Sequence, residues 1–189
     1  MTTLPTANQL ERLTLRAIAA YAARSARRGS APLRGIVEDN IIEAPLRVTE
    51  GVASVRELDE SVKVSIPLAA SCVVKAMAAL ETPQMRVAAL CLTRAARVSL
   101  AVLEAVRSEP PVLPGWARTQ IGHASHAAAP IPDNAAFALG DPWATTVIHA
   151  ARSDYEILLQ EFGEHTDVVL GEPIDFSDEW WRERRSYYL

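Results

Sequence analysis

The chain has 189 residues, of which 49% are hydrophobic but only 6% aromatic, and its formal net charge is −4. This length suits one domain and is sufficient to bury an apolar core without disulfides or metals. Alanine supplies much of the hydrophobic fraction and there are only eight glycines, which favours helices and argues against a turn-rich all-β fold.

The first predicted helix spans Ala7 to Arg28. Thr6 and Gln9 form a capping box before it, and Gly29 is a stop signal. Its arginines at positions 12, 16, 24 and 27 cluster on one side. Two interpretations stay open for this cluster: a salt-bridged bundle surface, or a face that binds the phosphates of a nucleic acid.

Two further helical segments are each interrupted by a proline. The second segment runs from about Pro32 to Glu50 and is expected to break or kink at Pro45, because proline lacks a backbone donor and clashes with the preceding turn. The third, about 55–80, follows a Ser54/Glu57 capping box and is expected to kink at Pro67. A helical apolar spacing continues across that proline at Val62, Ile66, Ala69, Val73 and Met77.

The fourth predicted helix begins at Pro83, with Thr82 as its N-cap, and ends before Pro110. Apolar residues surround most of it, which is typical of a helix at the centre of a bundle. Prolines then concentrate in residues 108–142, which we expect to form a long loop. The fifth helix is predicted over Trp143–Phe162, with Gly163 as its stop.

These elements predict an all-α protein: an antiparallel bundle of about five helices, with a long Pro-rich loop and an irregular acidic and aromatic tail. We expect residues 1–165 to form the bundle domain and residues 166–189 to form the tail, packed on the bundle or on a partner. Residues 153–189 hold ten acidic and three basic residues, which argues against nucleic-acid binding at this end.

Targeting signals and cofactor motifs are not evident. The N-terminal residues lack a basic stretch followed by an apolar run, and no uncharged apolar stretch reaches membrane-spanning length. Cys72 and Cys91 lie in alanine-rich helical runs and are predicted to be small core residues rather than a disulfide. A cytoplasmic protein without a cofactor is the expectation.

His123 and His126 stand three residues apart, as two metal ligands on one helix face can. A metal site needs three or four ligands, and His149 is the candidate that a folded-back loop could bring near. On its own helix, however, His149 lies opposite the apolar stripe, so the alternative is that all three are surface or helix-end residues. Ser125 lies between the first two histidines, but no motif of a nucleophile with its base accompanies it.

The tail concentrates aromatic residues. Trp180, Trp181, Tyr187 and Tyr188 are four of the chain's eleven aromatic residues. Such side chains either pack on the chain's own bundle or serve as anchors in an interface with a partner or a second copy. Both alternatives stay open from the sequence.

Two parts of the chain resemble a group of uncharacterised, alanine- and arginine-rich helical bacterial proteins. They are LTLRAIAAYAARSARRGSAPL at 13–33, and AARSDYEILLQEF followed by LGEPIDFSD within 150–178. Ser25 stands where that group usually has a cysteine, and Gly29 where it has a valine. The group is distantly similar to toxin-immunity-type helical proteins, so the resemblance implies protein binding and supplies no catalytic residue.

The predicted function is therefore that of a non-enzymatic protein-interaction module, immunity-like or an accessory subunit. It would bind a protein partner or a second copy through helix faces and the tail, with no membrane and with nucleic acid disfavoured. The alternative is a metal-binding protein or metallo-hydrolase that uses His123, His126 and His149.

Overall fold

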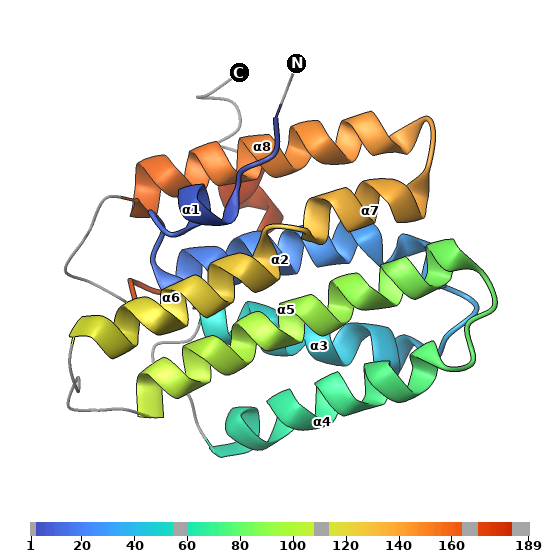
Figure 1. The fold of residues 1–189 in the computed structure, drawn as a ribbon, viewed down its shortest axis with the longest axis horizontal. Helices are drawn as coiled ribbons and strands as arrows, with labels where there is room; N and C mark the ends of the chain where they lie inside the picture. Colours follow the sequence, from blue (N-terminus) through green and yellow to red (C-terminus); the bar gives the residue numbers. More distant parts are fainter. Residues whose placement is uncertain (1–2, 55–59, 108–113, 164–169, 183–189) are drawn as a thin grey trace.

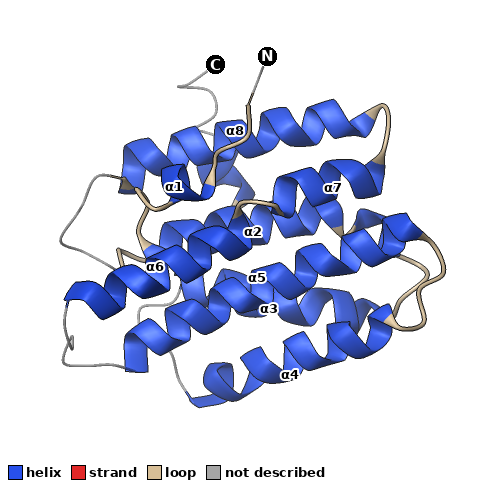
Figure 2. Ribbon diagram, viewed as in Figure 1, coloured by secondary structure: helices blue, strands red, loops and turns tan. Residues whose placement is uncertain are grey.

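The computed structural model describes residues 3–54, 60–107, 114–163 and 170–182, and within these ranges the chain is mainly helical, without named strands (Figures 1 and 2). The α-helices are α1 (Ala7–Leu10), α2 (Leu15–Gly29), α3 (Asp39–Ser54), α4 (Glu60–Met77), α5 (Pro83–Arg107), α6 (Pro114–Ala128), α7 (Ile131–Leu139) and α8 (Trp143–Phe162), with a short 3-10 helix η1 (Ala31–Leu33). The all-α prediction is confirmed. The described ranges hold eight α-helices rather than about five.

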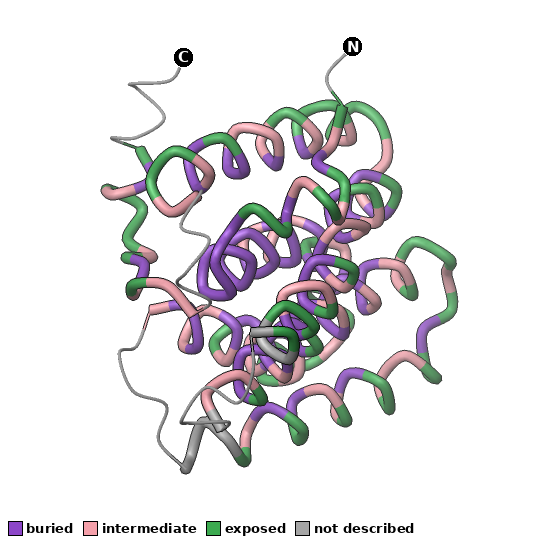
Figure 3. Tube along the Cα trace, turned by 60° about the vertical axis from the view of Figure 1, so that its left-hand side comes forward, coloured by how far each residue is buried: buried purple, intermediate pink, exposed green. Residues whose placement is uncertain are grey.

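Helix α5 is central, as its all-round apolar sequence predicts. It packs against α2, α3, α4, α6 and α7, and Figure 1 shows it crossing the middle of the molecule. Small residues such as Ala88 and Ala95 are fully buried on it, which lets neighbouring helices approach closely. The predicted cap is present, since the Thr82 hydroxyl oxygen accepts from the Met85 backbone N–H at 3.2 Å. In Figure 3 the buried stretches gather in the interior and the exposed ones on outer helix turns.

The first predicted helix is two helices. The Thr6/Gln9 capping box is confirmed, but α1 ends at Leu10 and α2 begins at Leu15, where Thr14 is a second N-cap. Leu13 forms an isolated bridge with Gly163 instead of continuing the helix. The chain therefore starts a new helix at the Thr14 cap, although the apolar spacing of the sequence is continuous across this point.

The prolines at 45 and 67 lie inside α3 and α4, so the helix continues through Pro45 and a break there, one of the two predicted outcomes, is wrong. Pro45 and Leu46 are both buried, and this packing offsets the hydrogen bond that proline cannot make. Helix α3 starts later than predicted, at Asp39, because residues 31–33 form η1, and it ends later than predicted, at Ser54. The Ser54/Glu57 capping box extends into residues outside the described ranges.

The predicted Pro-rich loop over 108–142 is wrong for its described part, which forms α6 and α7. Pro114 is the first residue of α6, and Pro132 lies in the first turn of α7. Proline is well tolerated at these positions because the first-turn N–H groups have no intrahelical acceptor. Helix α8 has the predicted bounds, and Gly163 is its C-cap.

The tail is packed on the bundle where the structure describes it. The Arg16 N–H donates to the Leu170 carbonyl at 3.1 Å, and the Ile174 N–H donates to the Ala53 carbonyl at 3.0 Å. Ile174 and Trp181 belong to the same hydrophobic core as the helices. The expected boundary near residue 165 therefore does not separate two cores.

Candidate functional site

Helix α4 lies at one edge of the molecule and packs on α3 and α5 (Figure 1). Its inward stripe agrees with the prediction for Ile66, Ala69 and Val73, which are all buried. On the opposite side, Val64 is 68% and Leu68 is 62% exposed. The helix is thus apolar on both sides, although only one side faces the core.

Several exposed residues of α4 and the turn after it follow a spacing of three or four residues. We define the α4 outer face as Val64, Pro67, Leu68, Ser71, Val74, Lys75 and Ala78, all of which are exposed. Val74 is 54% exposed, and Lys75 is the single charged residue of this set. Positions repeated in this way form a continuous stripe along a helix, which is the pattern that another helix can pack against.

A groove of about 640 Å³ runs beside this face, between α3 and α4. Its lining, here called the α3–α4 groove, is formed by Asp39, Asn40, Ile41, Glu43, Ala44, Arg47, Val48, Ser65, Leu68, Ala69 and Cys72. Leu68 belongs to both the groove and the outer face, so the two form one surface. Glu43 is engaged within the chain, since its carboxylate accepts from Arg34 at 3.0 Å and from Arg27 at 3.4 Å.

This surface is suited to binding another protein rather than to catalysis. Exposed aliphatic side chains gain free energy when another protein covers them, because water is released from apolar area. Contiguous exposed apolar patches on proteins commonly mark interaction sites. An apolar groove beside a helix face is also the shape into which a partner helix can lie.

The three predicted metal ligands are not assembled into a site. His123 and His126 are exposed on α6, and His149 is exposed on α8. Across the described ranges, no group of three or more His, Cys, Asp and Glu side chains is placed to hold a metal ion. Ser125, between the two α6 histidines, is instead fully buried.

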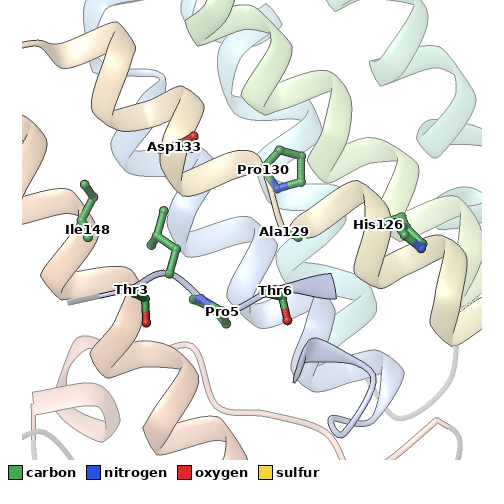
Figure 4. A pocket seen from close by; sticks show the side chains of 9 residues that line it. Thr3, Pro5, Thr6, His126, Ala129, Pro130, Asp133 and Ile148 are labelled. Carbon is green, nitrogen blue, oxygen red and sulfur yellow. The ribbon is translucent and has the colours of Figure 1, made fainter. Parts of the chain in front are cut away.

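One of these histidines lines a separate pocket of about 590 Å³ between the N-terminal segment and the α6–α7 junction (Figure 4). The pocket is lined by Thr3, Leu4, Pro5, Thr6, His126, Ala129, Pro130, Asp133 and Ile148. His126 and Asp133 are its titratable side chains, and Figure 4 shows Pro130 between them. Neither His123 nor His149 joins them in this lining.

The predicted aromatic anchors of the tail lie in different settings. Trp181 is only 2% exposed, and its ring packs edge-on against Trp180 with centroids 4.9 Å apart. Trp180 is half-buried and stacks on Phe162 at 6.0 Å. Tyr187 and Tyr188 lie outside the described residues. The Trp181 side chain therefore contributes to the chain's own core.

Two arginines of the predicted cluster, Arg24 and Arg27, and the neighbouring Arg28 form ion pairs within the chain. Arg24 Nε and Arg28 Nη2 donate to the same Oδ2 atom of Asp154, at 3.2 Å and 2.5 Å, and the Asp154 side chain is fully buried. Arg27 pairs with Glu50 at 2.7 Å. Burial, followed by the nearby Asp154 carboxylate, raises the pKa of Tyr21 and keeps its phenol neutral. The contacts of Arg24 and Arg27 agree with the salt-bridged interpretation for these two members of the cluster.

Sequence reasoning did not identify Val64, Leu68 and Val74 as surface residues. The available signal was a second apolar stripe on the same helix, opposite the one assigned to the core. A helix at the edge of a bundle has neighbours on one side only, so one of two such stripes must be exposed.

Comparison of the chain with protein-family models, with curated proteins and with solved structures finds no match. None of the helices in the described ranges has both the length and the apolarity needed to cross a bilayer.

Proposed function

We propose that this chain is a non-enzymatic protein-interaction module, of an accessory or immunity-like type. It binds a protein through the α4 outer face and the adjoining α3–α4 groove. The observation that carries this proposal is the exposure of three large aliphatic side chains, Val64, Leu68 and Val74, each more than half exposed on one helix.

These side chains gain free energy when another protein covers them. Removing apolar surface from water contributes roughly 25 cal/mol per Å² to the binding free energy. A partner that covers all three residues gains this contribution from each of them. The groove adds further apolar lining from Ile41 and Val48. Such a module acts by occluding the surface of its partner or by positioning it, without a chemical step.

In this proposal only some of the aromatic residues of the tail contact the partner. Trp181 positions the tail on the bundle, because its side chain is buried there. Partner contacts from the tail would come from Trp180, Tyr187 and Tyr188. The metallo-hydrolase alternative lacks support, since the three histidines do not group.

The test uses the tagged full chain, expressed at its native level in the cells that produce it and sized by gel filtration after gentle lysis. The wild-type chain is expected to elute as a complex larger than the monomer. Leu68→Glu with Val74→Glu is expected to shift it to the monomer position. Phe137→Glu is the matched control, because Phe137 is 55% exposed on α7, away from this face. Elution of all three proteins as monomers would overturn the proposal.

A further inference from the structure

We draw no further inference here: the strongest candidate, the largely buried cluster of Arg24, Arg28 and Asp154 between α2 and α8, carries none, because its arginines and carboxylate already pair with one another and neither of the two pockets described above is lined by its side chains.

Discussion

The ring of Trp181 lies over the guanidinium of Arg24, with Cζ of Arg24 4.0 Å from the ring centroid. The same guanidinium donates to the buried carboxylate of Asp154 on α8. The C-terminal segment, α2 and α8 therefore meet at one cluster that combines a cation–π contact with ion pairs. This cluster explains why the described part of the tail is packed on the bundle.

Replacing Trp181 with alanine should lower the free energy of unfolding by about 3–5 kcal/mol, the usual cost of removing a buried large aromatic side chain. Urea denaturation followed by circular dichroism measures the change. Trp143→Ala is the matched control, because Trp143 is 60% exposed, and it should have little effect. Equal effects of the two substitutions would contradict the burial of Trp181.

Replacing Asp154 with asparagine should cost about 3–5 kcal/mol of stability, because Arg24 and Arg28 would lose the charge that compensates theirs in a largely buried site. Glu156→Gln, two residues further on, removes the partner of Arg152 at a side chain that is 48% exposed. An exposed pair of this kind contributes at most about 0.5 kcal/mol. Thermal unfolding of both variants should separate them clearly; a stability of Asp154→Asn equal to wild type would show that the Asp154 pairs contribute nothing.

Two helical glycines should respond to alanine in opposite directions. A Cβ at Gly29 would lie 2.8 Å from Ala135 Cβ and 2.8 Å from Cys91 Sγ, so Gly29→Ala should destabilise the chain by about 1–3 kcal/mol. A Cβ at Gly51 meets nothing within 4 Å, so Gly51→Ala should stabilise α3 by about 0.5–1 kcal/mol. Chemical denaturation gives both values, and a stabilising Gly29→Ala would show that α2 and α7 are not packed this closely.

The two cysteines should differ in reactivity. Cys91 is fully buried, and burial raises the pKa of its thiol to about 12, whereas Cys72 is half-buried in the α3–α4 groove. A thiol reagent at neutral pH should therefore modify Cys72 in the folded chain and Cys91 only after unfolding. Rapid modification of two thiols in the folded chain would be inconsistent with the structure.

The same thiol should make stability depend on alkaline pH. The Cys91 thiol has an ordinary pKa of 9.0 when unfolded, so the unfolded chain loses this proton first as the pH rises. The stabilising contribution is complete below pH 9 and declines as the pH rises towards 12. Cys91→Ala should show a smaller loss of unfolding free energy between these pH values.

The sequence predicts an element well where several signals agree. Helix α8 has a proline before it, one clean apolar stripe and a glycine after it, and its bounds match the prediction. Proline gives an ambiguous signal, because it can both start and interrupt a helix. The prolines at 114 and 132 lie in first turns, and the one at 45 lies in a helix interior that packing stabilises.

The candidate site was less predictable because it depends on contacts between distant segments. The local sequence of α4 does not indicate which of its two apolar stripes contacts α3 and α5. The exposed stripe can be identified only when the positions of these two helices are known. Trp181 could equally anchor a partner until its contact with Arg24, on a helix at the other end of the chain, is known. The spacing of His123 and His126 indicates a shared helix face but supplies no third ligand.

Photo-cross-linking in the producing cells shows whether this protein meets another protein at the α4 outer face. A photoreactive residue replaces Leu68 in one variant and His149, which is exposed on α8, in the other. A protein adduct is expected from position 68 and none from position 149, with an adduct of twice the chain's mass if the partner is a second copy. An adduct from position 149 and none from position 68 would show that the partner does not bind at the α4 outer face.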